Sequence, residues 1–439
     1  MAGPQFPADF LWGVSASAFQ IEGAVAEGGR GRSSWDTFCA TPGKIAGDET
    51  ADVACDHYHR YAEDVALMAG LGVDAYRLSF AWPRIQPDGS GKPNPEGIAF
   101  YDRLLDALCA AGITPVGTLY HWDTPQPLED AGGWRNRETA LRFGEYARIA
   151  AERFADRVPM WIPINEPMVT SIYGYAIGQY APGEFLLLDA LPTAHHQNLA
   201  HGLAVQALRA AGADQVGTAN NHGPVWPVGP DDGDAASAMD ELINRLFADP
   251  VLLGRYPDRY TEHLPAGFAD DLPAIATPID FYGVNYYEPQ AAASPSPGNP
   301  LPFDLVPVEG YPMTTNDSPI VPGALTELLV GMRDRYGDAL PPIHITENGC
   351  SFDDEVGPDG RVRDGARIEF LEAHLRALAD AMAAGVDVRG YFVWSILDNF
   401  EWSKGYAPRF GLVHVDFKTL QRTPKDSYRW YRDLIASAR

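Results

Sequence analysis

Eight short apolar runs, separated mostly by helix-like segments, constrain this chain more than any other feature of its sequence. Strand and helix alternating eight times predict a parallel sheet closed into a (β/α)8 barrel. Barrels of this kind often exceed the usual domain length, so we expect residues 1–439 to form one α/β domain. The runs are FLWGVSASAFQIEG from Phe10, VDAYRLSF from Val73, ITPVGTLYH from Ile113, VPMWIPINE from Val158, QVGTANNH from Gln215, IDFYGVNYY from Ile279, PIHITENG from Pro342 and VRGYFVWSILDNF from Val388.

The segments between the runs carry a helical pattern. LRFGEYARIAAERFA and IEFLEAHLRALADAMAAG place apolar residues at steps of three and four, and the second ends at Gly385, a typical helix stop. The longest irregular stretch extends from about residue 288 to 323 and is rich in Pro, Gly, Ser and Ala. A long loop after a barrel strand is often functional, so we expect a wall of the pocket mouth. A flexible tether between domains is the alternative.

Each run begins with apolar residues and ends in residues that can do chemistry. In such barrels the active site lies at the C-terminal ends of the strands. We therefore expect the polar strand ends to converge on one pocket. They carry Gln20, Glu22, Arg77, His121, Asn165, Glu166, Asn221, His222, Asn285, Tyr287, Glu347 and Trp394.

The net charge of −26 limits the partners of such a pocket. A surface this acidic repels nucleic-acid phosphates and anionic lipids, so we expect a neutral small molecule instead. No apolar run approaches the roughly 18 residues of a membrane span. The first residues lack the basic and apolar regions of a signal peptide, so we expect a cytoplasmic protein.

No metal or cofactor is expected. His195, His196 and His201 cluster on one expected helix, but no carboxylate or further His stands at a convincing ligand spacing. Ordinary packing or surface exposure explains them better. The four cysteines have no CxxC spacing, which argues against a disulfide framework and a zinc site; they are Cys39, Cys55, Cys109 and Cys350.

Glu166 and Glu347 are the strongest candidates for catalysis. They end the fourth and seventh runs, and each stands beside an Asn. Hydrolysis of a glycosidic bond needs two carboxyl groups: one protonates the leaving oxygen, and the other attacks directly or activates water. A single Glu at a strand end is more often a solvated or salt-bridged side chain, but two favour this chemistry. A separation of about 5–5.5 Å would make the mechanism retaining.

The chain resembles glycoside hydrolase family 1, the β-glucosidase family, from Phe6 to the C-terminus. A single matching tripeptide such as NEP could recur by chance, but the full set of matching segments, in the same order along the chain, is specific to the family. The resemblance implies a barrel whose extended loops form a deep pocket. It also implies a retaining exo-β-glycosidase, above all a β-glucosidase, acting on β-glucosides or short cello-oligosaccharides, with β-galactosides or β-fucosides as side substrates. The matching segments are FLWGVSASAFQIEG, YRLSFAWPRIQP, LYHWDTPQPL, NEP, VNYY, ITENG, VWSILDNFEW, GYAPRFGLVHVD and RTPKDSYRWY.

The same resemblance implies residue roles. Glu166 would be the acid/base and Glu347 the nucleophile. The guanidinium of Arg77 and the phenol of Tyr287 would favour the ionised form of Glu347. The negative charge on Glu347 would in turn raise the pKa of Glu166. The implied supports of the nucleophile are Arg77, Tyr287 and Asn285. The implied sugar-binding residues are Gln20, His121, Trp122, Asn165, Glu401 and Trp402, with Trp394 as the platform under the ring.

Three residues depart from the family pattern. Pro163 stands where most relatives have Thr, and a proline inside a strand predicts a bulge or a bent strand end that shifts Glu166. Met168 and Tyr180 stand where Trp and His are common. Because those positions line the side of the leaving group, its identity is in question.

Three other functions stay open. A 6-phospho-β-glucosidase is disfavoured, because Pro408 and Phe410 stand where that branch places Lys and Tyr, and because Glu401 is present. A catalytically silent sugar-binding barrel is disfavoured because both glutamates are present. An enzyme cutting inside polysaccharides is disfavoured because Glu401, Trp402 and Gln20 should close the pocket around one terminal sugar. The sequence leaves the oligomeric state open.

Overall fold

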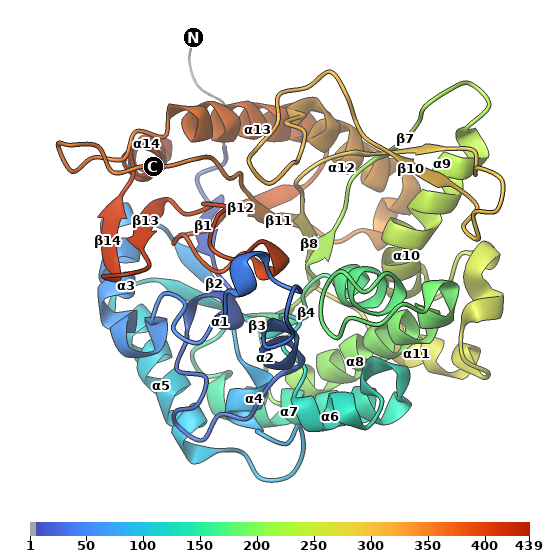
Figure 1. Cartoon of the computed structure of the whole chain (residues 1–439), viewed down its shortest axis with the longest axis horizontal. Helices are drawn as coiled ribbons and strands as arrows, with labels where there is room; N and C mark the ends of the chain where they lie inside the picture. Colours follow the sequence, from blue (N-terminus) through green and yellow to red (C-terminus); the bar gives the residue numbers. More distant parts are fainter. Residues whose placement is uncertain (1–5) are drawn as a thin grey trace.

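A parallel sheet curls around the centre of the molecule, and a ring of helices surrounds it (Figure 1). The computed structural model describes residues 6–439. Neighbouring strands of this sheet pair in parallel, in the order β5-β4-β3-β2-β1-β12-β11-β8-β6. Their bounds are β1 Leu11–Ser15, β2 Ala75–Ser79, β3 Thr114–Tyr120, β4 Met160–Ile164, β5 Gln215–Val216, β6 Asn220–Asn221, β8 Tyr282–Asn285, β11 Ile343–Asn348 and β12 Val388–Trp394.

The two ends of this sheet are halves of one barrel strand. β5 and β6 both fall in the fifth expected run and are separated by residues 217–219. Single bridges between Gly217 and Phe281, and between Asn165 and Ala219, continue the pairing across the gap. The sheet therefore closes through eight strand positions, which confirms the expected (β/α)8 barrel.

Helices follow the strands and form the outer ring. Apart from their last residues, the two helical patterns lie in α7 (Arg137–Phe154) and α13 (Gly365–Ala383). Gly385 stands two residues beyond α13 with φ at 99°, as a terminating glycine does. The longer helices are α3 His57–Leu71, α5 Pro95–Ala110, α7 Arg137–Phe154, α8 Leu191–Ala210, α9 Gly233–Asp240, α10 Leu246–Leu253, α12 Pro322–Tyr336, α13 Gly365–Ala383 and α14 Asp426–Ala438. The shorter ones are α1 Ala18–Ile21, α2 Ser34–Cys39, α4 Trp82–Ile85, α6 Gln126–Asp130 and α11 Leu272–Ile275.

Helix α7 illustrates how the ring is fixed to the barrel. Asn136 precedes the helix, and its side chain accepts a hydrogen bond from the backbone N–H of Glu138, which caps the first turn. On the buried face, the hydroxyl of Tyr146 donates to the carbonyl oxygens of Phe80 and Leu119, at 3.1 and 3.0 Å. Those carbonyls lie where β2 and β3 end, so the helix is tied directly to the C-terminal ends of these strands.

Side chains fill the other end of the barrel. A separate buried cluster contains one or two residues from nearly every strand, as in the packed interior of a barrel. Gly13 in β1 makes room for it, because a Cβ there would lie 2.2 Å from the ring of Phe392. The cluster consists of Ala75, Val116, Met160, Ile162, Ala219, Phe281 and Phe392, with Leu11 packed against it. The pocket therefore has a solid floor.

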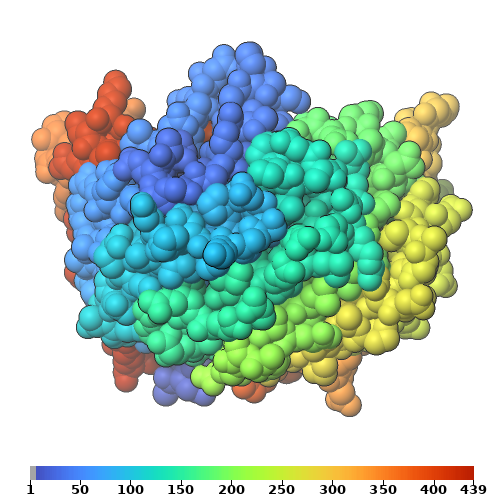
Figure 2. All heavy atoms as spheres, turned by 90° about the horizontal axis from the view of Figure 1, so that it is seen from below, coloured from blue at the N-terminus to red at the C-terminus, as the bar shows by residue number. Residues whose placement is uncertain are grey.

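The expected irregular stretch of residues 288–323 is partly ordered as sheet. It contains β9 (Gln290–Ala293) and β10 (Asp304–Val306), which form a small sheet with β7 (Val225–Pro227). Strands of three or four residues carry too few alternations to be read from sequence, so this expectation was wrong. A further antiparallel pair joins β13 (Val413–Asp416) and β14 (Gln421–Pro424). Figure 2 shows the packed flank of the molecule, with a segment from the first quarter of the chain, in blue, rising above it.

Pro163 does not bend its strand as predicted. In β4, Met160 pairs with Val116 and Ile164 pairs with Tyr120, so the register is the same before and after the proline. Only the pair opposite Pro163 itself is missing from this ladder. The proline thus removes one position of pairing without the predicted bulge.

Among residues 6–439, no helix is long and apolar enough to cross a membrane.

Candidate active site

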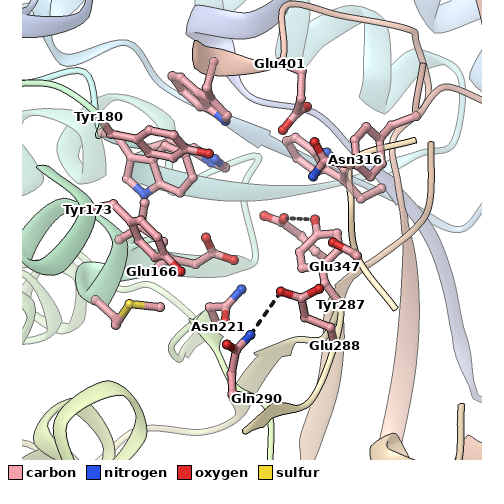
Figure 3. A pocket seen from close by; sticks show the side chains of 18 residues that line it. Glu166, Tyr173, Tyr180, Asn221, Tyr287, Glu288, Gln290, Asn316, Glu347 and Glu401 are labelled. Atoms are coloured by element: carbon pink, nitrogen blue, oxygen red, sulfur yellow. Dashed lines mark hydrogen bonds between the residues drawn. The ribbon is translucent and has the colours of Figure 1, made fainter. Parts of the chain in front are cut away.

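A pocket of about 830 Å³ opens at the C-terminal ends of the barrel strands. It contains both candidate glutamates, and their side chains point into it from opposite sides (Figure 3). Its lining residues are His121, Trp122, Glu166, Met168, Val169, Tyr173, Tyr180, Asn221, Tyr287, Glu288, Gln290, Asn316, Ser318, Glu347, Trp394, Glu401, Trp402 and Phe410.

Glu347, in β11, is held by two strong donors. The Arg77 guanidinium, from β2, forms a buried ion pair with Oε1 of Glu347, and the hydroxyl of Tyr287 donates to Oε2 at 2.7 Å. Burial raises the pKa of Glu347 above its usual value, against the opposing effects of Arg77, Tyr287 and Asn285. Both oxygens are thereby fixed, and the ionised form has the partners it needs.

Glu166, at the end of the fourth run, has a different environment. It is buried and accepts a hydrogen bond of 2.6 Å from the amide of Asn285. Burial and the charge of Glu347 raise the pKa of Glu166 to about 8, against smaller opposing effects of Asn285 and Arg77. Glu166 is therefore the carboxyl group of the pair that holds a proton near neutral pH.

Asn165 links several of these groups. Its Oδ1 accepts from Arg77 at 2.5 Å and from Asn285 at 3.0 Å, so Nδ2 is its donor. Nδ2 contacts Nε2 of His121 at 3.1 Å. Burial and Arg77 lower the pKa of His121 far below its usual value, which leaves the ring neutral. Nε2 then accepts, and the remaining ring proton lies on Nδ1.

Aromatic side chains form the end of the pocket near Glu401. The His121 ring is stacked with Trp394 and Trp402, at centroid distances of 5.7 and 5.9 Å. The Gln20 side chain lies behind this end and donates to Oε2 of Glu401 at 3.3 Å. Burial and the charge of Glu347 raise the pKa of Glu401 to about 8. Flat apolar faces beside polar groups are the surroundings that a sugar ring prefers.

Three pocket residues have a backbone conformation that side chains rarely adopt. Trp122, Glu166 and Trp402 have φ values of 74°, 46° and 50°. Such left-handed residues cost free energy and are common at functional sites. Trp122 is further held by its indole N–H, which donates to the carbonyl oxygen of Asn165 at 3.0 Å.

The sequence as a whole matches a known family. The model described as glycosyl hydrolase family 1 matches residues 3–439. The chain belongs to glycosyl hydrolase family 1. The predicted resemblance is thereby confirmed, and the chain is an enzyme of the glycoside hydrolase class.

Named relatives of this family 1 chain are β-glucosidases. Thermostable β-glucosidase B of Thermobispora bispora is 49% identical, over 98% of this chain and 90% of the relative. The bifunctional β-D-glucosidase/β-D-fucosidase of Bifidobacterium breve is 44% identical, over 98% of both chains. The solved β-glucosidase of Thermotoga maritima in complex with noeuromycin is 41% identical, with a TM-score of 0.95 over 99% of both chains.

Six expected strand-end residues of this family 1 chain do not line the pocket. Four lie behind it and bond to lining residues; they are Gln20, Arg77, Asn165 and Asn285. The other two turn elsewhere. Glu22 is buried instead against Arg84, with an ion pair of 2.8 Å, and accepts from the hydroxyl of Tyr101. His222 turns away and contacts Asn244 at 2.9 Å. Glu22 follows the short helix α1, seven residues after β1 ends, and His222 directly follows β6, so neither side chain is directed by a strand.

Several lining residues were not predicted. Val169 and Tyr173 come from the π-helical segment Val169–Ala176 that follows Glu166. The others lie on the long segment after β8, and they are Glu288, Gln290, Asn316 and Ser318. The expectation that this segment forms a wall of the pocket was correct. Its individual residues carry no periodic signal, although Glu288 directly follows the VNYY motif.

The histidine cluster on α8 has ordinary packing partners. His195 contacts Tyr256 and Asp271, at 2.9 and 3.0 Å, and His196 contacts the carbonyl oxygen of Trp134. Burial lowers the pKa of His201 to about 4. Within residues 6–439, no group of three or more His, Cys, Asp or Glu side chains is arranged to hold a metal ion.

Proposed function

We propose that this family 1 enzyme is an exo-acting, retaining β-glucosidase, with Glu347 as nucleophile and Glu166 as acid/base. The opposite surroundings of the two carboxyl groups carry the proposal. Arg77 and Tyr287 donate to both oxygens of Glu347, whereas burial and Glu347 raise the pKa of Glu166 to about 8. One group is thus prepared to attack and the other to give a proton.

In the first step, a carboxylate oxygen of Glu347 forms a bond to the anomeric carbon. The bond from that carbon to the leaving oxygen breaks, and Glu166 transfers its proton to this oxygen. The products are a free alcohol and a glycosyl ester on Glu347. Because the ester is neutral, the charge that raised the pKa of Glu166 is gone, and Glu166 is left ionised.

In the second step, Glu166 acts as a base. It takes a proton from a water molecule whose oxygen attacks the anomeric carbon, and the ester bond to Glu347 breaks. The sugar leaves with its original anomeric configuration, because two inversions have occurred. Both glutamates return to their starting protonation states.

The residues near Glu401 support binding of one neutral sugar unit. Trp394 offers a flat face for the sugar ring. Polar groups around that face can reach the hydroxyls of the sugar. We propose that these groups are Gln20, His121, Trp122, Asn165, Glu401 and Trp402. Of these, Asn165 is suited to the 2-hydroxyl, a contact that strengthens in the transition state.

Unphosphorylated β-glucosides, including short cello-oligosaccharides, are the proposed substrates, with β-fucosides and β-galactosides as side substrates. The bifunctional relative of Bifidobacterium breve supports this range. Among the described residues, no Lys or Arg lines the pocket, which argues against a phosphorylated sugar. We further propose that residues 1–439 are one catalytic domain, since one hydrophobic cluster extends from Phe10 to Ile435.

Initial rates on a substrate panel test this function. The panel is aryl β-glucoside, β-galactoside, β-fucoside and 6-phospho-β-glucoside, with Glu347→Gln as control. We expect hydrolysis of the unphosphorylated glucoside by the wild type and none by the control. Activity on the phosphorylated sugar alone would refute the proposed substrate, and silence on the whole panel would favour a sugar-binding protein without catalysis.

A further inference from the structure

A lysine that the proposed chemistry does not use is completely buried near the end of the chain. Lys425 directly follows β14, and 0% of its surface is exposed. Its Nζ donates to Oδ2 of Asp354 at 2.5 Å and to Oδ1 of Asp398 at 2.8 Å. A buried ammonium group needs such partners, because its removal from water costs free energy. Two carboxylates from different segments therefore meet at this one cation.

Asp398 lies on the segment that connects two sugar-binding residues of the proposed site. Trp394 ends β12, Glu401 follows later on the same segment, and Asp398 stands between them. Oδ1 of Asp398 also accepts from the backbone N–H of Gly411 at 2.9 Å, and Oδ2 accepts from Arg409 at 2.8 Å. Both carboxylate oxygens thus fix the middle of this segment.

Only two residues separate Asp398 from Glu401, and both contact Gln20. The side-chain amide of Gln20 donates to the side chain of Asn399 at 3.0 Å and to the carbonyl oxygen of Phe400 at 2.9 Å. The same amide donates to Oε2 of Glu401 at 3.3 Å. A displacement of Asp398 would therefore reach the Glu401 carboxylate through directly bonded groups.

Asp354, the other partner of the lysine, lies on the segment that follows the proposed nucleophile. Strand β11 carries Glu347, and Cys350 comes shortly after it. Arg367, from α13, forms a buried ion pair with Asp354 and also donates to the carbonyl oxygen of Cys350. Lys425 thus bridges the segment after β11 to the segment after β12.

Opposite charges balance in the cluster around Lys425. Although burial opposes it, the charges of Lys425 and Arg409 lower the pKa of Asp398, so this carboxyl group stays ionised. A buried ion pair often adds little stability compared with apolar residues of the same shape, whereas its hydrogen bonds are lost unless the partners keep one arrangement. The cluster consists of Lys425, Arg367, Arg409, Asp354, Asp364 and Asp398.

We propose that Lys425 is a positioning residue: by bridging Asp354 and Asp398, it holds the Glu401 carboxylate in place to bind the sugar. This role rests on the proposed function, in which the anomeric carbon lies at Glu347. Position 4 of a pyranose lies across the ring from that carbon. Figure 3 shows Glu401 at one end of the pocket, beyond Glu347. Glu401 can therefore reach the 4-hydroxyl, and Lys425 affects recognition of this hydroxyl without touching the sugar.

Two substrates that differ by one hydroxyl test this role. They are 4-nitrophenyl β-glucoside and its 4-deoxy analogue, and the measured quantity is the ratio of their kcat/KM values. Because the same enzyme sample cleaves both, this ratio does not depend on how much of a variant is folded. A purely structural loss would therefore leave the ratio unchanged.

Two variants break the bridge, and two controls leave it in place. Lys425→Met removes the cation, and Asp398→Asn removes a charge that it binds. Lys418→Met removes an exposed lysine between β13 and β14. Asp249→Asn removes a buried carboxylate of α10 that pairs with Arg335 of α12 at 2.8 Å. This second control lowers stability outside the pocket, and thermal unfolding of all variants measures the loss.

The wild type should prefer the glucoside, because a site that bonds a hydroxyl rejects the analogue that lacks it. Lys425→Met should lower this preference about ten-fold, since a displaced Glu401 no longer meets the hydroxyl. Asp398→Asn should lower it about five-fold, and this variant decides the question if Lys425→Met fails to fold. Both controls should keep the wild-type ratio, even where the melting temperature falls.

Each remaining outcome counts against the role of Lys425. An unchanged ratio in the folded bridge variants, with an active wild type, would overturn it and leave the proposed function intact. So would an equal fall of the ratio in Asp249→Asn, or a wild type that cleaves both substrates equally well. A wild type inactive on both substrates would overturn the proposed function and the positioning role together.

Discussion

The two ends of the pocket are built differently. At the end near Glu401, barrel strand ends supply fully buried groups such as Arg77 and Asn165, and each is held by several hydrogen bonds. At the outer end, connecting segments supply half-buried groups such as Tyr173 and Glu288. Strands fix atoms more closely than loops do, whereas loops vary more freely. The comparison indicates that the inner end sets the reaction and the outer end sets the leaving group.

The largest effect is expected at the inner end. Glu347→Gln should lower kcat by about ten-thousand-fold or more, because no ester can form without the nucleophile. Steady-state rates on an aryl β-glucoside, together with a circular dichroism spectrum, measure activity and folding. Substantial residual turnover by a folded variant would refute the assignment of the nucleophile.

Glu166→Gln should separate substrates by their leaving groups. A sugar leaving group needs protonation, so kcat/KM for cellobiose should fall about 10²- to 10⁴-fold. An activated nitrophenyl glucoside departs without a proton, so its first step should be affected far less. The measurement is kcat/KM of wild type and Glu166→Gln on both substrates. Equal losses of kcat/KM on cellobiose and on the nitrophenyl glucoside would argue against Glu166 as the acid.

Tyr287→Phe removes one donor from Glu347 and keeps the ring. The hydroxyl lies 2.7 Å from Oε2 of Glu347, and loss of a hydrogen bond to a charged group should lower kcat/KM about ten- to hundred-fold. Tyr286→Phe is the matched control, because that hydroxyl bonds to the carbonyl oxygen of Val321 instead. Similar losses in the two variants would indicate a packing effect.

The pH profile should show the proton on Glu166. The acid form is active and its pKa is raised to about 8, so kcat/KM should be highest below that pH and fall as pH rises through it. Between pH 7 and 9 the loss should be about ten-fold for cellobiose. The Glu166→Gln variant should lack this alkaline limb, and a limb that persists in it belongs to another group.

The smallest effect is expected at the outer end. Met168 lines the pocket where Trp is common in the family, so Met168→Trp should change the ratio of cellobiose to aryl glucoside about three-fold. Tyr180 lies instead towards the Glu401 end, where its ring is 6.0 Å from that of Trp122 (Figure 3). The anomeric configuration of the product should stay the same. If this variant lost activity on every substrate equally, the division between the two ends would be too simple.

The same division explains what the sequence could predict. The barrel and its eight strands could be predicted because alternation and apolar runs repeat, and the resemblance supplied Glu166 and Glu347 with their neighbours. Glu288, Gln290 and Tyr173 were missed because β9 and the π-helical segment Val169–Ala176 are too short to show a period in the sequence. Glu22 was misplaced because the short helix α1, which the sequence did not reveal, lies between it and β1. His222 was misplaced because a side chain just beyond a strand end can turn either way.

Pro163 shows a different limit. A proline in a strand predicts a bulge from local rules, yet β4 keeps one register on both sides of it. The barrel holds the strand through its other pairs, so tertiary structure overrides the local preference. The split of the fifth strand into β5 and β6 was equally invisible, because it concerns pairing between strands and not the composition of one.

Trapping the covalent intermediate tests the central claim most directly. A 2-deoxy-2-fluoro-β-glucoside with a good leaving group should form the ester readily and release it slowly, because the fluorine destabilises an oxocarbenium-like transition state. Mass spectrometry of the intact protein and of its peptides should find one sugar, attached to Glu347. A sugar attached to Glu166 or Glu401, or no adduct in an enzyme that hydrolyses the parent glucoside, would contradict the account.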